Sequence, residues 1–549
     1  MNDFYTRVQD LAGVSPRTPA IVWWRGRDNL RTTGWAGLAE KASALRVGFL
    51  REASNQRLLP MFLTKSPTCV AAMVGAMGTG IPFACLNRKL RGPQISEVLA
   101  AAEAKVALID VPGVMAIRST WQNHPTLAET TWWLMDAHEA AGPQSDLIAG
   151  MRQDGFRLVD DPTLADAAPD VDQSSATVQP PPDPKAEGCC LFTSGSTGTP
   201  KGVRIGLDDL VARAQAEVDC FGLTPDDVLL SLLPFSFDVG LNQLLTALSV
   251  GCRIVLLNSW LPADILAASA STGVTGISGV PSIWLDMLNA GFQFETGGEH
   301  SRLRYLTLSG GDLSETDLGR LPELAPGAGI FKTYGQTEAF RATCLQPEEF
   351  KDRPLSVGRP FATTRVYVVG EDGNLCGPGE VGEVVHTGLG VMLGYLDGED
   401  PERKLRPNPF RGSEDPSSKA VFTGDLGYLD SEGYLFLKGR RDAMLKVAGN
   451  RVYPREIQAQ ILSIEGVMEA AVLGIPDAEL GTKIVCFAVL SEGVDLKPAI
   501  IRRRLAGLLP SYMVPAQIFL LPGLPRTASG KTDYPTLRAR AVELLTGKS

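Results

Sequence analysis

The chain of 549 residues has only 4 histidines and 9 cysteines, and neither residue type has the spacing of a metal site or a disulfide framework. No histidine has metal-ligand spacing to a cysteine or a carboxylate, so we expect no structural zinc. The cysteines are scattered and odd in number, and the pair Cys189 and Cys190 lies in an apolar run. This usage predicts reduced, buried thiols in a cytoplasmic protein rather than a disulfide framework.

Basic residues and long apolar runs are also scarce. The 52 Lys+Arg against 62 Asp+Glu give a net charge of −10, which argues against a nucleic-acid-binding surface, although a local pocket can still be positive. The amino terminus lacks a basic patch followed by an apolar run, so we expect no secretory signal. The most apolar stretch, 70–86, is interrupted by three glycines and a proline and predicts a buried helix and turn instead of a membrane span.

The length exceeds what one hydrophobic core usually supports, so we expect at least two domains. Helical periodicity alternates with short apolar runs through residues 1–168 and again from 189 to about 440, which predicts an α/β fold. A proline-rich stretch at 169–188 indicates an exposed connector.

Two further patterns refine this division of the chain. Segments 363–369 and 382–386 look like antiparallel strands bounded by Gly/Pro turns. This pattern predicts a β-subdomain. After Arg441 the pattern is βαβ-like and long enough for a small domain. We therefore expect a large domain of mixed α/β layers at 1–441 and a small, mobile α+β domain at 442–549.

The run LFTSGSTGTPKGV at 191–203 is flanked by apolar residues, so we expect it to join two strands. Its glycines allow successive N–H groups to point at one spot, while hydroxyls and one ammonium add donors for a polyphosphate. The spacing is not that of a Walker A loop, and a flexible linker seldom lies between apolar strands. The candidate phosphate-binding residues are Thr193, Ser194, Gly195, Ser196, Thr197, Gly198 and Lys201.

Four later segments carry polar groups on glycine-containing turns. They are SGGD at 309–312, TYGQTE at 333–338, FTGDLG at 422–427 and PRTASGK at 525–531. A carboxylate beside a hydroxyl, as in Thr337 and Glu338, can hold Mg²⁺ together with a phosphate oxygen. Asp425 suits the two hydroxyls of a ribose, and Lys531 could bridge two anionic reactants. Each segment alone would also fit an ordinary turn or a solvated loop.

In this order, over nearly the whole chain, these segments resemble the adenylate-forming superfamily of acyl-CoA synthetases, peptide-synthetase adenylation domains and luciferases. The pattern is most similar to stand-alone acyl-CoA ligase-like members. The resemblance implies ATP and Mg²⁺ as cofactors and an acyl-adenylate as the intermediate of an AMP-forming acid ligase.

The resemblance also implies roles for individual residues. Lys531 would catalyse adenylation, Thr337 would contact the α-phosphate and Glu338 would hold the magnesium ion. Lys446 would serve the second half-reaction, with Gly449 leaving room for a slender nucleophile, and Asp442 would be the hinge of the small domain. The adenine and ribose would be bound by Gly310, Gly311, Asp312, Tyr334, Gly335, Gln336, Asp425 and Arg440.

The acyl pocket is expected at Phe237, Asp238, Ser278, Gly279 and Ser309. Asp238 stands where peptide-synthetase domains bind an amino group, but it could equally cap a helix. Few basic residues lie near these segments in the sequence, which disfavours a dicarboxylic acid.

The acyl acceptor stays open at the level of sequence. A thiol, either coenzyme A or the phosphopantetheine of a carrier protein, is expected first, and an amine in an amide-forming ligase is the alternative. A non-catalytic nucleotide-binding relative would not be expected to keep Lys531, Glu338 and Asp425. A serine hydrolase would need a G-x-S-x-G elbow, which Ser194-Gly195-Ser196 does not supply.

Overall fold

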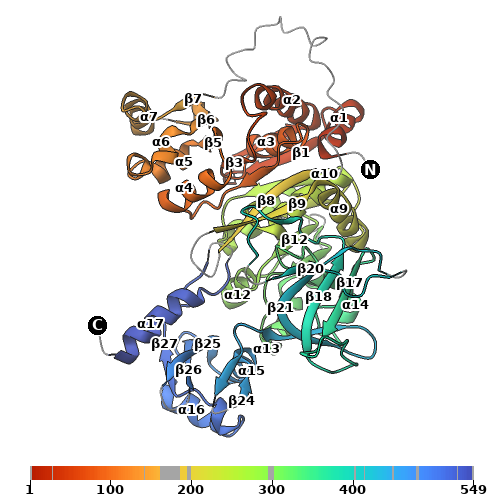
Figure 1. Cartoon of the computed structure of the whole chain (residues 1–549), viewed down its shortest axis with the longest axis vertical. Helices are drawn as coiled ribbons and strands as arrows, with labels where there is room; N and C mark the ends of the chain where they lie inside the picture. The colour runs from red at the N-terminus through yellow and green to blue at the C-terminus, as the bar shows by residue number, and fades with distance from the viewer. Residues whose placement is uncertain are drawn as a thin grey trace, which may run out of the picture.

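A computed structural model describes residues 3–27, 29–140, 142–160, 186–194, 200–294, 302–400, 403–412, 415–447, 450–477, 481–527 and 530–546. Most of the connector predicted at 169–188, and the centre of the predicted phosphate loop at 195–199, lie outside these residues. Figure 1 shows a large body formed by the first four fifths of the chain and a small unit, in blue, formed by the rest.

A nine-stranded sheet forms one half of the large body in the described parts of the chain. Strands β1 and β10 to β14 run parallel, whereas β2, β15 and β16 are antiparallel to their neighbours. In spatial order the strands are β16 (Arg359–Pro360), β15 (Thr343–Leu345), β14 (Gly329–Tyr334), β13 (Tyr305–Leu308), β12 (Gly276–Gly279), β10 (Val228–Ser231), β11 (Arg253–Leu257), β1 (Pro19–Trp24) and β2 (Leu30–Gly34).

An eight-stranded sheet forms the other half of the same described regions. Strands β8 and β9 pair antiparallel with Thr193 opposite Lys201, so the prediction that two strands flank the phosphate loop is confirmed. In spatial order the strands are β19 (Gly394–Tyr395), β9 (Pro200–Gly206), β8 (Glu187–Ser194), β4 (Phe83–Cys85), β3 (Leu59–Phe62), β5 (Val106–Asp110), β6 (Thr131–Met135) and β7 (Leu158–Asp160).

A layer of helices lies between the two sheets, because one hydrophobic cluster joins these helices to strands of both. Helix α3 is buried on nearly every side. It begins at Ser66, whose hydroxyl accepts the Cys69 N–H at 3.1 Å, and the stretch 70–86 ends in β4. In the residues that can be assessed, no helix is long and apolar enough to cross a membrane. The helices of this layer are α1 (Phe4–Val14), α2 (Trp35–Glu52), α3 (Pro67–Met77), α9 (Leu207–Phe221) and α10 (Asp238–Val250).

Two outer layers of helices complete an α/β/α/β/α arrangement, so the predicted α/β class is confirmed. One layer covers the nine-stranded sheet, and the other, in orange in Figure 1, covers the eight-stranded sheet. The first comprises α11 (Pro262–Thr272), α12 (Pro281–Asn289) and α13 (Glu315–Leu324); the second comprises α4 (Gly92–Ala101), α5 (Val111–Ile117), α6 (Pro125–Glu129) and α7 (Pro143–Gln153). The short helix α14 (Pro347–Phe350) follows β15.

An antiparallel β-subdomain follows, as the Gly/Pro-rich alternation predicted. Val366 pairs with His386 between its first two strands. Asp425 pairs with Arg440 between its last two strands, which brings two predicted ribose-binding residues together. The strands are β17 (Thr364–Val369), β18 (Gly382–Gly388), β20 (Leu405–Pro407), β21 (Lys419–Leu429) and β22 (Leu435–Arg440).

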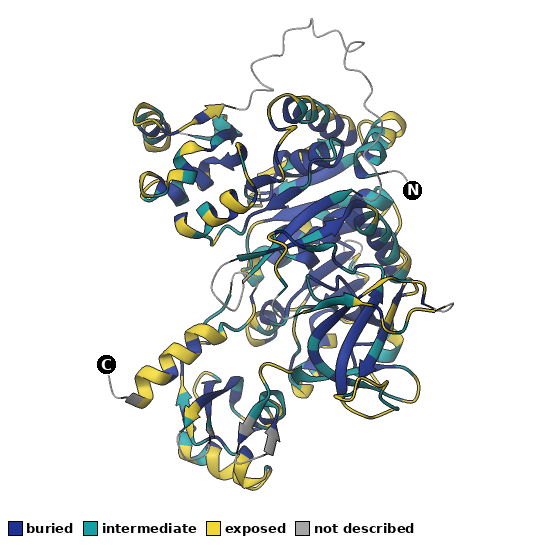
Figure 2. Cartoon of the chain, viewed as in Figure 1, coloured by how far each residue is buried: buried dark blue, intermediate teal, exposed yellow. Residues whose placement is uncertain are grey.

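The carboxyl-terminal unit has its own hydrophobic clusters, and their described members all come from residue 445 onward. Strands β26 and β27 are parallel and joined through α16, so the βαβ pattern is confirmed. Figure 2 shows exposed outer faces on α16 and α17. The elements are β23 (Leu445–Val447), β24 (Asn450–Val452), α15 (Pro454–Leu462), β25 (Val467–Asp477), β26 (Gly481–Leu490), α16 (Pro498–Ala506), β27 (Gln517–Leu520) and α17 (Tyr534–Thr546).

Candidate functional site

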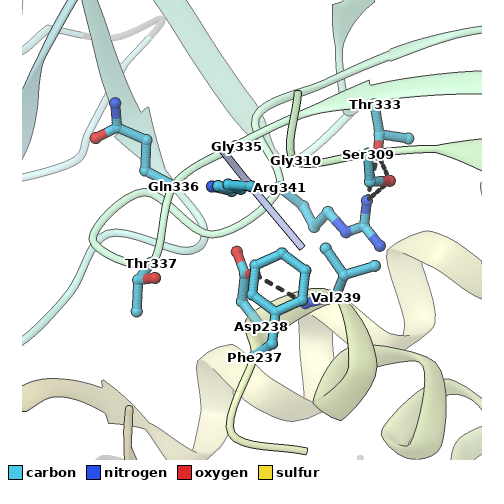
Figure 3. Close-up of a pocket in the computed structure, with 11 residues that line it drawn as sticks. Phe237, Asp238, Val239, Ser309, Gly310, Thr333, Gly335, Gln336, Thr337 and Arg341 are labelled. Carbon is cyan, nitrogen blue, oxygen red and sulfur yellow. Dashed lines mark hydrogen bonds between the residues drawn. The ribbon is translucent and has the colours of Figure 1, made fainter. Parts of the chain in front are cut away.

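A pocket opens at the carboxyl ends of β13 and β14 and at the first turn of α10 (Figure 3). Because these two strands are parallel neighbours, the segments that follow them meet at one edge of the sheet, where α/β proteins usually bind ligands. Among the described residues, the small unit contributes Lys531 to this pocket. The lining residues are Phe237, Asp238, Val239, Ser309, Gly310, Thr333, Gly335, Gln336, Thr337, Arg341 and Lys531.

A tight turn after β14 delivers several of these residues. The Ala342 N–H donates to the Tyr334 carbonyl at 2.7 Å, and the Gln336 N–H donates to the Ala339 carbonyl at 3.0 Å. A Cβ at Gly335 would lie 2.5 Å from the Arg341 nitrogen, so a larger residue would force this turn open. The turn places Thr337 on the pocket wall.

Glu338 belongs to this turn and is 7% exposed. Its Oε1 accepts hydrogen bonds from Lys404 Nζ at 2.7 Å and from the Tyr395 hydroxyl at 3.0 Å. Burial acts to raise the pKa of Glu338, but the Lys404 ammonium and the hydrogen bonds outweigh it and leave the pKa below its ordinary value. The Glu338 carboxylate is therefore ionised at neutral pH and can offer a negatively charged oxygen to a metal ion.

The Glu338 carboxylate has the chemistry of a magnesium ligand. In the assessed residues, no group of three or more His, Cys, Asp or Glu side chains could hold an ion. Mg²⁺ is usually held by one or two carboxylates together with water and phosphate oxygens. The single buried carboxylate of Glu338 meets that requirement.

A second cluster unites three elements around Asp425. Its Oδ2 accepts hydrogen bonds from the Tyr334 hydroxyl at 2.6 Å and from the Gln336 side chain. Arg440 Nη1 lies 3.4 Å from its Oδ1. Burial, followed by the nearby Asp425 charge, raises the pKa of Tyr334, so its hydroxyl stays a donor. Four of the eight residues predicted to bind the adenine and ribose, namely Tyr334, Gln336, Asp425 and Arg440, therefore form one connected network.

The flanks of the phosphate loop lie close to the Glu338 cluster. Lys201 Nζ is 5.7 Å from the centroid of the Tyr395 ring, and Tyr395 in turn contacts Glu338. Of the predicted loop residues, Gly195, Ser196, Thr197 and Gly198 lie outside the described residues, as does the side chain of Ser194. Their proposed contacts with phosphate stay predictions.

Lys531 reaches the pocket on a loop that is seated against the large domain. Gly530 has φ +82°, and a Cβ there would lie 2.8 Å from Ser282 Oγ, so only glycine allows this seating. The Lys531 N–H donates to Thr527 Oγ1 at 3.1 Å. Its Nζ lies 5.6 Å from the centroid of the Phe237 ring. A cation from the far end of the chain thus enters the site.

Asp238 is the first helical residue of α10, and Phe237 occupies the N-cap position. The interpretation of Asp238 as the helix cap is therefore wrong: within the described residues, its Oδ1 accepts the N–H of its neighbour Val239, at 2.9 Å, and makes no capping bond to the helix. The carboxylate instead lines the pocket and is 7% exposed. Burial raises its pKa, against the opposing charges of Lys531 and Arg341.

Two residues predicted for the acyl pocket lie beside it. Ser278 and Gly279 belong to β12 and are buried. A Cβ at Gly279 would lie 2.3 Å from the Trp284 ring, so this glycine makes room for Trp284. Neither residue is among the described residues that line the pocket.

Asp312 connects the two domains. Its Oδ1 lies 2.8 Å from Lys332 Nζ, and its Oδ2 accepts a hydrogen bond from Arg455 on α15. Gly311 is exposed and packs against Pro281. The expected contacts of Gly311 and Asp312 with nucleotide stay predictions, since neither borders the pocket among the described residues.

The hinge and hairpin residues are described only in part. Asp442 is exposed, and its Oδ1 accepts a hydrogen bond from Arg440 Nε at 3.1 Å. Lys446 lies in β23, but its side chain is outside the described atoms, and Gly449 is outside the described residues.

Sequence reasoning missed Arg341, Lys404 and Tyr395. Arg341 lies only three residues after Glu338, and a lone arginine in an otherwise uncharged run could have been noticed. Lys404 contacts a residue 66 positions away, and local sequence carries no signal for such a contact.

Comparison with known proteins places this arrangement in context. The profile of the AMP-binding enzyme family matches residues 8–396, and that of the AMP-binding enzyme C-terminal domain matches 456–531. A 2-succinylbenzoate–CoA ligase of Bacillus velezensis is 32% identical over 412 residues, covering 72% of this chain and 78% of that protein. ATP-bound MatB from Rhodopseudomonas palustris superposes with a TM-score of 0.81 at 22% identity, covering 99% of this chain and 100% of that chain.

Similarity extends to much longer proteins. Bacitracin synthase 3 of Bacillus licheniformis is 31% identical over 352 residues, which cover 63% of this chain. The matched region spans only 5% of that synthase.

Proposed function

The chain belongs to the AMP-binding enzyme family, and from this premise we propose that it is an ATP-dependent acid–CoA ligase. It activates a carboxylic acid as an acyl-adenylate, releases pyrophosphate, and transfers the acyl group to the thiol of coenzyme A. One observation supports this function most strongly: Lys531 lines the same pocket as Thr337, Ser309 and Phe237, although it comes from the other domain.

The nucleotide occupies the side of the pocket that Gln336 and Thr337 line, next to the clusters around Asp425 and Glu338. Asp425 accepts hydrogen bonds from the ribose hydroxyls, with Arg440 neutralising the carboxylate. Tyr334 and Gln336 flank the adenine. Glu338 holds Mg²⁺, which when bound neutralises charge on the phosphate oxygens. Thr193, Lys201 and the loop between them bind the β- and γ-phosphates.

Adenylation joins two anions, so its barrier is largely electrostatic. A carboxylate oxygen attacks the α-phosphorus, and the bond from that phosphorus to the bridging oxygen breaks, with pyrophosphate as the leaving group. Lys531 donates to both the attacking carboxylate and an α-phosphate oxygen, which offsets their repulsion and aligns them. Thr337 donates to the same phosphate.

Transfer to the thiol requires Lys531 to leave. We place the domain boundary between residues 441 and 442, with Asp442 as the pivot of a rotating small domain. The Arg455–Asp312 contact between the domains breaks in this rotation. The hairpin with Lys446 and Gly449 then borders the pocket, the thiolate sulfur attacks the acyl carbon, and AMP departs.

Replacing Lys446 by alanine should separate the two half-reactions. Acid-dependent ATP–pyrophosphate exchange should persist, because Lys531 is intact. Thioester formation from preformed acyl-adenylate should fall roughly 10- to 100-fold if Lys446 orients the second step. Stopped-flow or quenched assays of AMP release measure this step, and Lys483→Ala is the matched control on the same domain. An unchanged second step in Lys446→Ala removes this lysine from the mechanism.

The function itself is tested by pyrophosphate and AMP release over a panel of fatty, aryl and amino acids. Each acid is offered with coenzyme A, with a phosphopantetheine-bearing carrier protein, and with simple amines. We expect acid-dependent AMP formation and a thioester with coenzyme A. A product formed only with the carrier protein, or an amide formed only with amines, would replace the acceptor named here. A protein that converts no acid at all would be a non-catalytic nucleotide-binding relative.

A further inference from the structure

Arg341 is a buried cation in the wall of the acyl pocket, and the mechanism above does not use it. It is 3% exposed and lines the pocket with Asp238, Val239 and Phe237. Its backbone has φ 51°, a region that non-glycine residues seldom adopt and that costs stability unless the surroundings enforce it. The turn that begins at Gly335 enforces this conformation.

Three neighbours hold the guanidinium in one orientation. Nη1 donates to Ser309 Oγ at 2.9 Å and to Thr333 Oγ1, and Figure 3 shows both bonds. Nε lies 2.8 Å from Glu217 Oε1 in an ion pair, but the two atoms are not aligned for a hydrogen bond. Nη2 is also buried and has no hydrogen-bond partner within the described residues. A buried donor without a partner is costly, and it is usually explained by a ligand or a water molecule.

The charges around Arg341 indicate the kind of substrate group to which Nη2 would donate a hydrogen bond. Glu217, whose side chain is 2% exposed, forms an ion pair with Arg341 and also interacts with the buried Arg213. Asp238 adds a carboxylate to the same pocket. A second carboxylate on the substrate would therefore meet a guanidinium that is already paired with Glu217, and a nearby like charge from Asp238. An uncharged oxygen, such as a carbonyl or hydroxyl, needs only the donor that Nη2 offers.

We propose that Arg341 selects acids that carry an uncharged hydrogen-bond-accepting oxygen in their acyl part, such as keto, acyl or hydroxy acids. This inference rests on the proposed ligase function and narrows its substrate class. Arg341 acts on recognition: the acid lies with its carboxylate toward Lys531 and its second oxygen at Nη2. An acid of the same shape without that oxygen leaves Nη2 unpaired and binds more weakly.

Matched acids test the proposal in wild-type protein. Saturated and benzoic acids are compared in series that contain three kinds of acid. These are the plain acid, its derivatives with an oxo or hydroxyl group at successive positions, and the corresponding dicarboxylic acids. At its best position, the neutral oxygen should raise kcat/KM for pyrophosphate release roughly 10- to 100-fold over the plain acid, mainly through KM. The dicarboxylic acid should not exceed it.

Substitution of Arg341 then tests whether this residue causes the preference. In Arg341→Met the ratio of kcat/KM for the oxygenated acid to kcat/KM for the plain acid should fall to near 1. Because that change strands the buried Glu217, the Glu217→Gln/Arg341→Gln double variant keeps a neutral pair and should lose the ratio too. Lys332→Met is the control: Lys332 is equally buried and paired with Asp312, but it does not line the pocket. It should keep the ratio.

The outcomes distinguish this inference from the ligase function. Pyrophosphate release with equal kcat/KM for plain and oxygenated acids leaves the ligase intact and overturns the role of Arg341. A preference for the dicarboxylic acid, or a ratio that survives in both Arg341 variants, overturns it as well. Failure of every acid to release pyrophosphate overturns the function itself.

Discussion

Replacing Lys531 by alanine is expected to lower acid-dependent ATP–pyrophosphate exchange by roughly 100- to 1,000-fold. The carboxylate and the α-phosphate are both anionic, and Lys531 is the described cation that the small domain delivers to their side of the pocket. The loss should fall on kcat more than on the KM for ATP, because the bridging contact strengthens as charge develops at phosphorus.

Two companion variants make this result specific. Lys497→Ala removes a lysine of the same domain at the start of α16, and it should leave exchange unchanged. Gly530→Val keeps the ammonium but introduces side-chain atoms where Ser282 Oγ lies 2.8 Å from the Cβ position. It should lower exchange because the loop cannot seat. Exchange that survives in Lys531→Ala would mean that another group performs the adenylation step.

Replacing Glu338 by glutamine is expected to raise the Mg²⁺ concentration needed for half-maximal exchange roughly 10- to 100-fold. Glutamine keeps the size of the side chain but removes the negative charge that a hard cation prefers. Mn²⁺ binding in the presence of ATP, followed by electron paramagnetic resonance, should weaken in parallel. This readout does not depend on turnover.

Stability has to be separated from metal binding in this variant, because Lys404 loses its counter-ion. The two side chains are 13% and 10% exposed and lie 2.7 Å apart, so loss of this buried ion pair should destabilise the fold. The Glu338→Gln/Lys404→Gln double variant removes both charges. It should recover thermal stability while the weak Mn²⁺ binding remains. Normal Mn²⁺ affinity in either variant would show that Glu338 is not the metal ligand.

The sequence predicted the elements that local pattern specifies. The short apolar runs at 253–257 and 305–308 predict strands, and β11 and β13 occupy these residues. The Gly/Pro-punctuated segments predicted the pairing of β17 with β18. Short glycine turns predicted where polar side chains would leave the strands, since such turns need particular residues at fixed positions.

Asp238 illustrates where local reasoning stopped. An Asp before an apolar helix suits an N-cap, but the helix begins one residue earlier, with Phe237 at the cap. The carboxylate is consequently turned to the pocket. Helix ends are uncertain by one or two residues in sequence, and here one residue decides between a structural and a binding role.

Periodicity and turn chemistry, which act over a few residues, were enough to predict the α/β class, the small carboxyl-terminal domain and the order of the candidate nucleotide-binding segments. Three further relations follow from packing alone: Lys404 neutralises Glu338, Arg455 reaches Asp312, and the buried Arg341, which has an unpartnered nitrogen, lines the pocket. Those relations join residues far apart in the chain or depend on burial. Burial and partner charge are properties of packing, which no local pattern encodes.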